Sequence, residues 1–259
     1  MARGKLYIVL FATGVCGVFS VIVSLAAVTL KDRQDANRKL DQQRNVLMVA
    51  GLIEEGERVT PERADELFEL NIEAKLVELA TGEVLPEEDA LAYDQQRALS
   101  DPSTSRLAPP NRANVHRIPN KAVVYLIKPG GGDLEAVIFP IEGQGLWGTM
   151  YSFLAVAPDL ETIKGVTFYE HAETPGLGGE IENRRWRSAW VGKKLFDEDG
   201  EVAFRVVKGA AREGDEFAVD GLAGATLTAN SVTYMVQFWL GEHGFGPYLD
   251  NLAAETGGG

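Results

Sequence analysis

The fold is decided by residues 122–169, which read AVVYLIKPGGGDLEAVIFPIEGQGLWGTMYSFLAVAPDLETIKGVTFY. Short runs rich in β-branched and aromatic residues alternate here with Gly, Pro and Asp, a pattern typical of strands joined by turns. Because these runs are spaced as a meander, we expect an antiparallel sheet. The expected strands, including one further along the chain, are Ala122–Ile127, Leu134–Phe139, Met150–Val156, Ile163–Tyr169 and Val202–Val207.

Helices are expected on both sides of these strands. Thr60 and Pro61 have the pattern of an N-cap followed by the first residue of a helix. Near the C-terminus, apolar residues recur with helical spacing at Val232, Met235, Val236, Trp239 and Leu240. Residues 101–120 hold four prolines and indicate a long connection. The sequence therefore predicts an α+β fold, an antiparallel sheet with flanking helices.

The N-terminus contains a long apolar run. Leu6–Leu30 extends for 25 residues without a charge between Lys5 and Lys31. A helix of that length rises about 37 Å, which exceeds the ~30 Å hydrocarbon core of a bilayer. A cleaved signal peptide is the alternative, but its apolar region usually has only about 7 to 15 residues. We therefore expect a transmembrane anchor over 1–30, a juxtamembrane helix over 31–60 and an extramembrane domain over 61–259.

Charge is unevenly distributed along the chain. The formal net charge is -13, with 25 Lys and Arg against 38 Asp and Glu. Residues 1–44 hold seven basic and three acidic residues, so residues 45–259 hold 18 against 35, a net of -17. Such an acidic body repels nucleic acid, which we exclude as a partner. The basic residues after the span outnumber those before it, which favours a cytoplasmic domain, but long domains translocate largely regardless of such charges.

A glycine-containing segment leads into the predicted C-terminal helix. Asp220–Thr228 reads DGLAGATLT, and its small residues allow another backbone to approach closely. The segment places Thr226 or Thr228 at a helix N-terminus, where free amides and the helix dipole favour an anion such as phosphate. The alternative is a threonine that merely caps the helix after a glycine turn.

This segment resembles the flavinylation motif of a known family, the NqrC subunits of the sodium-translocating NADH:quinone reductase. Four further segments resemble that family in the same order, namely Gly145–Tyr151, His171–Ile181, Trp190–Leu195 and Gly244–Leu249. With the N-terminal anchor, the resemblance spans nearly the whole chain. One position departs from the family pattern, because the usual hydroxyl residue at the start of the motif is Ala223 here.

The resemblance implies a covalent cofactor and a role in electron transfer. In this family the threonine at the position of Thr226 is esterified to the phosphate of FMN by a separate flavin transferase, which uses FAD and magnesium. The flavin relays electrons from NADH toward ubiquinone, coupled to Na⁺ export. Catalysis belongs to the whole complex, so this chain has no catalytic residues of its own. The resemblance also implies a bacterial inner membrane location, with the domain facing the periplasm.

The same resemblance suggests which residues hold the flavin. Leu146 and Trp147 would form an apolar wall, although a tryptophan in a glycine-bounded turn can also be a core residue. Glu173 would bind a ribityl hydroxyl or Lys208, because a carboxylate beside the ring disfavours an anionic reduced flavin. Lys208 would balance the phosphate, or else be a solvated surface residue. The remaining expected cofactor-binding residues are Thr174, Leu177, Gly224, Ala225 and Thr228. For Thr174 and Leu177 the alternative is that their segment is a plain Pro-Gly turn without a binding role.

Other sites and functions have weaker support in the sequence. His171 lies far from His116 and His243, and no spacing of Cys or carboxylates completes a metal site around it. No phosphate-binding loop or dinucleotide fingerprint is present. The alternatives are the RnfG protein of the related Rnf electron-transport complex and a non-redox, membrane-anchored binding or scaffold module. The segment Leu146–Tyr151 and the ending Gly244–Leu249 favour the first family.

Overall fold

A computed structural model describes residues 2–256, and the chain divides into two compact units, up to Gln43 and from Arg44 onward. Helix α1 runs over Ala2–Val49. Within it, Leu6–Lys31 has a mean hydropathy of 2.5 and is long and apolar enough to cross a membrane. Residue 1 and residues 257–259, at the ends of the expected anchor and domain, lie outside the described residues.

The expected juxtamembrane helix over 31–60 is helical only to Val49. Gly51, with a φ of 75°, lies just past the helix end, a position that favours glycine. The amides of Gly51 and Leu52 donate to the carbonyls of Met48 and Leu47, which ends the helix. The next helix, α2 (Pro61–Asn71), begins as predicted, because the Thr60 hydroxyl accepts a hydrogen bond from the Arg63 amide at 3.3 Å.

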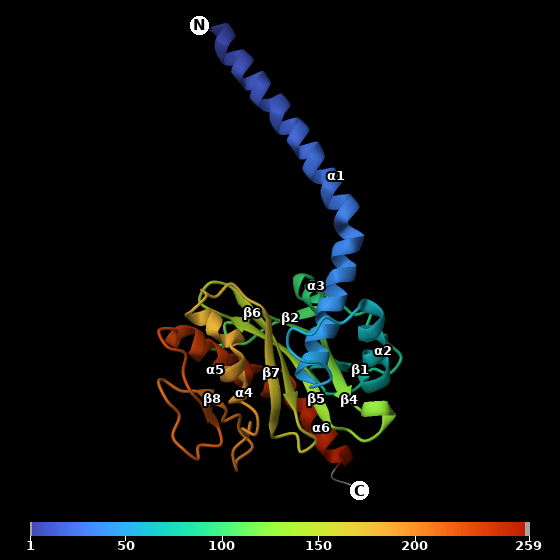
Figure 1. Cartoon of the computed structure of the whole chain (residues 1–259), viewed down its shortest axis with the longest axis vertical. Helices are drawn as coiled ribbons and strands as arrows, with labels where there is room; N and C mark the ends of the chain where they lie inside the picture. The colour runs from blue at the N-terminus through green and yellow to red at the C-terminus, as the bar shows by residue number, and fades with distance from the viewer. Residues whose placement is uncertain (1, 257–259) are drawn as a thin grey trace. The chain divides into compact units, whose positions relative to one another are not determined.

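The second unit is built on a five-stranded antiparallel sheet (Figure 1). Its strands, in spatial order, are β1 (Ile72–Glu78), β4 (Lys121–Ile127), β5 (Ala136–Gln144), β6 (Thr149–Val156) and β7 (Ile163–Glu170). The last four form the predicted meander. Strand β1 was not predicted, because Lys75 and two glutamates interrupt its apolar residues, yet it pairs with β4 along its whole length.

Helices α5 (Thr226–Leu240) and α6 (Gly246–Thr256) lie behind the sheet in the view of Figure 1. The predicted apolar stripe of α5 is fully buried, as are the large aromatic residues Trp190, Trp239, Phe139, Phe204 and Phe245. These residues and the inner face of the sheet form one core. Trp239 donates a hydrogen bond from Nε1 to the Glu142 carbonyl at 2.5 Å, which ties α5 to β5.

Two expectations about the connections need correction. Residues 101–120 are not a plain connection, because β2 (Ser105–Leu107) and β3 (Arg117–Pro119) pair there, after the short helix α3 (Gln95–Ser100). Pro119 is tolerated at the end of a two-stranded ribbon. The expected strand over 202–207 is reduced to β8 (Arg205–Val206), which pairs in parallel with β9 (Ala218–Val219). The other short elements are η1 (Pro129–Gly131), η2 (Gly178–Glu182) and α4 (Arg184–Ser188).

Candidate functional site

Thr226 is the first residue of α5 and does not cap it. The N-cap position is held by Ala225, which has no hydroxyl, and the helix has no side-chain cap. The side chain of Thr226 is exposed, and its hydroxyl makes no hydrogen bond within residues 2–256. The alternative of a capping threonine is therefore wrong for Thr226. It is wrong for Thr228 too, because that hydroxyl donates to the Glu173 carboxylate.

The first amides of α5 are free to bind an anion. The backbone N–H groups of Thr226, Leu227 and Thr228 have no acceptor within the described part of the chain. The earliest amide of this helix with an acceptor is that of Ala229, which donates to the Ala225 carbonyl at 3.0 Å. Free amides and the positive end of the helix dipole together favour a phosphate at this point.

Two glycines are needed in the loop before Thr226. A β carbon at Gly221 would overlap the Val207 carbonyl oxygen, so only glycine allows this close approach. Gly224 has a φ of 72°, in the left-handed region, and a β carbon there would lie 3.0 Å from Leu177 Cδ2. The loop therefore packs against the segment after β8 on one side and against Leu177 on the other.

Asp220 fixes the start of this loop. Its carbonyl accepts a hydrogen bond from Trp186 Nε1 at 2.8 Å, and its carboxylate accepts one from the Ala211 amide at 2.8 Å. The Gly221 amide donates to the Gly209 carbonyl at 2.7 Å. The segment that carries Thr226 is thus held by α4 and by the loop that follows β8.

Glu173 joins three segments around the site. It is buried, with 5% of its surface exposed. Its carboxylate accepts hydrogen bonds from the Trp147 amide, at 3.1 Å, and from the Thr228 hydroxyl. Gly145 and Gly178 lie directly against the carboxylate, where any side chain would collide with it. Glu173 therefore connects the turn between β5 and β6, its own loop and α5.

Lys208 does not pair with Glu173, so that part of the expectation is wrong. The Lys208 side chain is exposed, and it forms no ion pair or hydrogen bond with any described residue. Its backbone nevertheless lies beside the motif loop, because its neighbour Gly209 accepts the hydrogen bond from Gly221. The Glu173 carboxylate accepts its hydrogen bonds from Trp147 and Thr228 instead.

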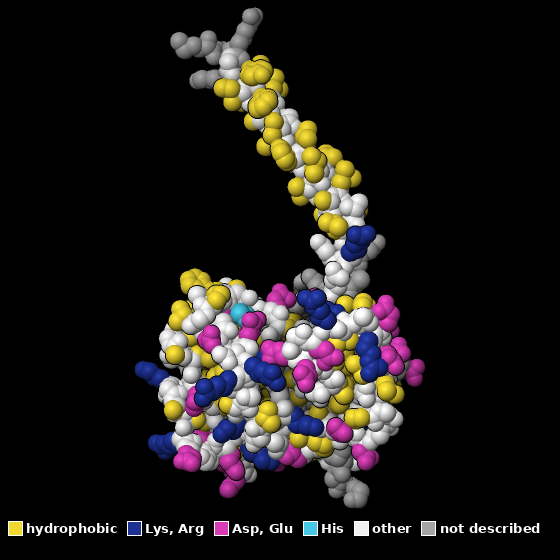
Figure 2. Space-filling view, viewed as in Figure 1, with side chains coloured by type: hydrophobic (Ala, Val, Ile, Leu, Met, Phe, Trp, Pro, Cys, Tyr) yellow, Lys and Arg dark blue, Asp and Glu magenta, His cyan; other side chains and the backbone are white. Residues whose placement is uncertain are grey.

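Four apolar side chains, on α5 and on the two turns linked to its start through Glu173 and Gly224, are exposed. Leu146 and Trp147 lie on the tight turn closed by the Gly145 amide and the Gly148 carbonyl, at 2.8 Å. Trp147 is 67% exposed, so it is not a core residue. Leu177 and Leu227 are 45% and 61% exposed. Figure 2 shows hydrophobic side chains gathered at the upper left of this unit, near the turn between β5 and β6. We call Leu146, Trp147, Leu177 and Leu227 the apolar patch.

The loop after β7 is a turn held by its own backbone. The Thr174 carbonyl accepts hydrogen bonds from the amides of Leu177, at 3.1 Å, and Gly179, at 2.9 Å. Gly176 has a φ of 76°. The side chain of Thr174 is exposed, whereas Ala225 is buried in the core. The segment is therefore a Pro-Gly turn, which places Leu177 against the motif loop and leaves the Thr174 side chain exposed.

His171 supports the Glu173 loop. Its Nδ1 accepts a hydrogen bond from the Glu173 amide at 3.1 Å, and its Nε2 lies 3.1 Å from Glu182 Oε1. The contact between Nε2 and Glu182 is a close approach without hydrogen-bond geometry. The ring thus positions the backbone of the residue that joins the three segments.

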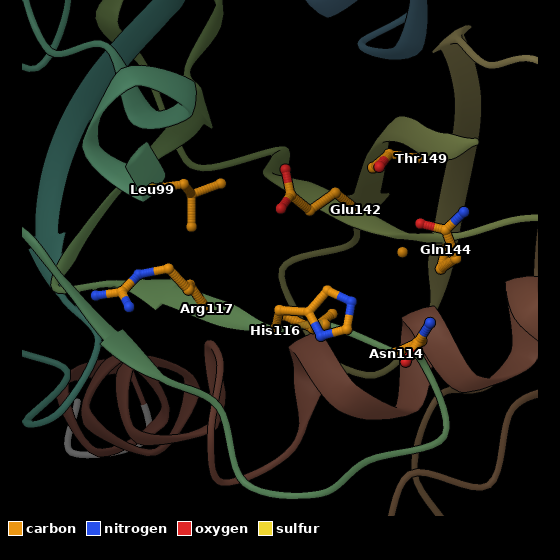
Figure 3. Close-up of a pocket in the computed structure, with 9 residues that line it drawn as sticks. Leu99, Asn114, His116, Arg117, Glu142, Gln144 and Thr149 are labelled. Carbon is orange, nitrogen blue, oxygen red and sulfur yellow. The ribbon is translucent and has the colours of Figure 1, made fainter. Parts of the chain in front are cut away.

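A cavity of about 200 Å³ is lined in part by Gln144 and Thr149, which flank the turn between β5 and β6. Glu142 reaches into it, and His116, Asn114, Gln144 and Thr149 also line it (Figure 3). Burial raises the pKa of Glu142 to about 7. None of the expected site residues lines this cavity. The sequence did not indicate it, because Glu142 is a single glutamate within a predicted run of strands and belongs to no motif.

Comparisons with known proteins show which proteins this chain is similar to. The family described as FMN-binding domain matches residues 145–241, which contain the two turns, Glu173 and Thr226. The chain is 47% identical over 239 residues to the NqrC subunit of the Na(+)-translocating NADH-quinone reductase from Yersinia pestis, covering 92% of this chain and 89% of that protein. It is 49% identical to the corresponding subunit from Vibrio parahaemolyticus, covering 91% and 90%. The crystal structure of Shewanella oneidensis NqrC superposes with a TM-score of 0.78 at 37% identity, covering 84% of this chain and 99% of that one.

Proposed function

Since the chain belongs to the NqrC family of the Na(+)-translocating NADH-quinone reductase, we propose that it carries FMN on Thr226 and relays electrons within that complex. The family and its FMN-binding domain make the chain a flavoprotein subunit of an oxidoreductase. The proposal adds the covalent bond, its position, and a path from NADH toward ubiquinone coupled to Na⁺ export.

The exposed hydroxyl of Thr226 is the observation that carries the proposal. Thr226 is exposed at the first position of α5, and its hydroxyl has no partner among the described residues. It stands beside three free amides that favour a phosphate. An ester from the Thr226 oxygen to phosphorus would use the hydroxyl and place the phosphate oxygens near these donors.

The surrounding residues fit the other parts of FMN. Lys208, whose side chain is free, would balance the phosphate charge, and the apolar patch would contact the ring. Gly224 and Ala225 allow the loop to approach closely, and Thr174 offers a hydroxyl at the patch edge. Glu173 and Thr228 act as positioning residues, because their polar atoms bond to each other and to the Trp147 amide. When bound, FMN supplies one- and two-electron chemistry, with its ring left free by attachment through the phosphate.

Attachment would require a separate flavin transferase with FAD and magnesium. In that step a bond forms between the Thr226 oxygen and the phosphorus of the FMN part, the pyrophosphate bond of FAD breaks and AMP leaves. The hydroxyl proton passes to a base of the transferase. The exposure of Thr226 supports modification by another protein, because the hydroxyl can be reached without unfolding the domain.

Family membership and the apolar N-terminal helix support a membrane anchor for this chain. The chain has an apolar helical segment, Leu6–Lys31, that fits a membrane anchor, and it is a subunit of a membrane complex. We propose that residues 1–30 form this anchor in the bacterial inner membrane, with the FMN-binding domain in the periplasm. The juxtamembrane region over 31–60 would connect them, as a helix to Val49 and as turns beyond it.

Co-expression with a flavin transferase tests the attachment. The intact mass of the chain should rise by one FMN less one water, and the denatured band should fluoresce in a gel. Thr226→Ala should abolish both signals. Thr60→Ala is the matched control, because it removes a threonine hydroxyl from a helix start where the hydroxyl does cap the helix. Retained fluorescence in Thr226→Ala would overturn the proposal.

A further inference from the structure

Glu142 is a partly buried carboxylate that has no partner in the fold. Its neighbour Gly143 lies against Met235 of α5, so the alternation of side chains along β5 directs Glu142 to the opposite face of the sheet. The Glu142 carboxylate forms no ion pair or hydrogen bond with any residue between 2 and 256. Taking a carboxylate out of water without a donor or a cation is costly, so a ligand that supplied the missing partner would be favoured here.

The carboxylate reaches into the cavity of about 200 Å³, with Leu99 of α3 across from it (Figure 3). Gln144 and Thr149, which face each other in the pairing of β5 with β6, line another side, and His116 lies at the exposed edge. A cavity of about 150 Å³ is large enough for benzene. The cavity at Glu142 therefore has room for a molecule of about six to eight non-hydrogen atoms.

The loop between β2 and β3 forms one wall of the cavity and is held in a fixed conformation. The Asn111 side chain accepts a hydrogen bond from the Val115 amide at 3.0 Å and donates one to the Val115 carbonyl at 2.8 Å. The Ala113 carbonyl accepts a hydrogen bond from the Gln144 amide at 3.0 Å. Asn114 has a φ of 54°, which is uncommon for a residue other than glycine. The cavity is therefore formed before any ligand enters it.

The neighbouring titratable groups do not neutralise Glu142. The Arg117 guanidinium donates to the Ser105 hydroxyl and carbonyl, at 2.8 and 2.9 Å, and Figure 3 shows it turned away from the Glu142 carboxylate. Tyr151 faces Glu142 from β6, and its pKa is raised by burial and then by the charge of Glu142. Burial likewise raises the pKa of Tyr169 on β7. Both phenols are thus neutral near pH 7, and the carboxylate still lacks a cation.

We propose that this cavity binds a small organic ammonium ion, with its nitrogen on the Glu142 carboxylate and its carbon skeleton against Leu99 and Val115. An ammonium group has three N–H donors, and the side chains of Gln144 and Thr149 offer further acceptors. The apolar residues match the carbon skeleton, and the carboxylate matches the charge. None of the residues proposed to hold FMN lines the cavity, so this inference is independent of the proposed function.

Other ligand classes fit the cavity less well. Within the described part of the chain, no group of three or more His, Cys, Asp or Glu side chains could hold a metal ion. His116 and Glu142 are the two such residues that line the cavity. An anion would meet the like charge of Glu142, and a neutral molecule would leave that charge without a partner.

Isothermal titration calorimetry of the detergent-solubilised full chain tests the proposal. The probe is cyclohexylammonium, which has seven non-hydrogen atoms and, like the Lys side chain, stays charged between pH 6 and pH 8. We expect a Kd on the order of 1 mM at pH 8, within the range for a ligand of this size. Cyclohexanol, of the same shape without the charge, should bind at least tenfold more weakly. Equal binding of the two compounds, or no heat of binding at about 20 mM cyclohexylammonium, would overturn the proposal.

Two variants locate the binding. Glu142→Gln keeps the size of the side chain and removes its charge, so it should weaken cyclohexylammonium binding at least tenfold at pH 8. Leu99→Trp should abolish binding by filling part of the cavity while the carboxylate stays in place. The matched control is Glu198→Gln, which makes the same charge change on an exposed loop and should bind as the wild type does. Wild-type binding by either Glu142→Gln or Leu99→Trp would show that the ammonium ion binds elsewhere.

The pH dependence separates Glu142 from His116. With a pKa of about 7, Glu142 is about nine-tenths ionised at pH 8 and about one-tenth at pH 6, so affinity should fall about tenfold between them. His116→Gln should keep this tenfold change, because the carboxylate remains. A loss of the pH dependence in His116→Gln would contradict the assignment of the ammonium ion to Glu142.

Discussion

The hydrogen bond between Thr228 and Glu173 should contribute measurably to stability, although it lies next to an exposed loop. Thr228 is 1% exposed and Glu173 5%, so neither group has water as a substitute partner. A hydrogen bond to a charged group contributes roughly 1.5 to 3 kcal/mol, and a buried group left without its partner costs a similar amount. Thr228→Val keeps the shape of the side chain but removes the donor. We therefore expect it to lower the free energy of unfolding by about 2 kcal/mol.

Glu173→Ala should cost more, because it removes the acceptor of both Thr228 and the Trp147 amide. Two lost hydrogen bonds of this kind amount to about 3 to 5 kcal/mol. The double variant Thr228→Val/Glu173→Ala loses the hydrogen bond between these two residues only once. Its loss of unfolding free energy should therefore be smaller than the sum of the two single losses by about 1.5 kcal/mol. Thr174→Val is the control, because that hydroxyl is exposed and bonds to no described residue; it should change stability by less than about 0.5 kcal/mol.

Urea unfolding of the detergent-solubilised full chain measures these values through tryptophan fluorescence. All four tryptophans lie in the second unit, so the signal reports on the domain that holds the site. If the effects of Thr228→Val and Glu173→Ala were additive within about 0.5 kcal/mol, the two residues would be energetically independent. That result would refute the reasoning that Glu173 holds the loop and α5 together.

Three further predictions concern other parts of the domain. Thr60→Ala should lower stability by about 1 kcal/mol through loss of its cap, whereas Thr226→Ala should change the stability of unmodified protein by less than about 0.5 kcal/mol; urea unfolding of both compares them directly. Gly221→Ala should cost about 2 to 3 kcal/mol, because its β carbon would overlap the Val207 carbonyl, and it should reduce in-gel flavin fluorescence; unchanged values would mean that the loop adapts freely. Glu142 has a pKa raised to about 7 by burial, so the folded protein binds its proton more tightly than the unfolded chain. The contribution of Glu142 to the free energy of unfolding is then fully present below about pH 4.5 and is lost as pH rises through about 7. Between these two pH limits the free energy of unfolding falls by about 3 kcal/mol. Glu142→Gln should remove this difference and stabilise the domain at about pH 8, and equal pH profiles of unfolding for both proteins would contradict it.

Much of the fold could be predicted from local pattern. The meander β4–β7 and the buried stripe of α5 follow from side-chain periodicity, which depends only on neighbouring residues. Strand β1 could not be found in this way, because its order comes from pairing with β4, far along the chain. The early end of α1 at Val49 has a local signal in Gly51, but helical composition continues beyond it and concealed the boundary.

The site could be predicted in part. The motif indicated Thr226, and the structure adds that its hydroxyl is free because Ala225 occupies the cap. The role of Glu173 could not be inferred, since Thr228, its partner, is 55 residues away and only the fold brings them together. The same holds for Trp186 and Asp220, whose hydrogen bond connects α4 to the motif loop. Contacts between distant residues leave no periodic trace in the sequence.

Peptide mass mapping of the chain from its native membrane tests the central claim most directly. No Lys or Arg follows Arg212, so trypsin releases residues 213–259 as one peptide, which contains Val219–Met235. We predict that this peptide carries one FMN through phosphorus and that fragmentation places it on Thr226. An unmodified peptide, or a flavin on any other residue, would contradict the account.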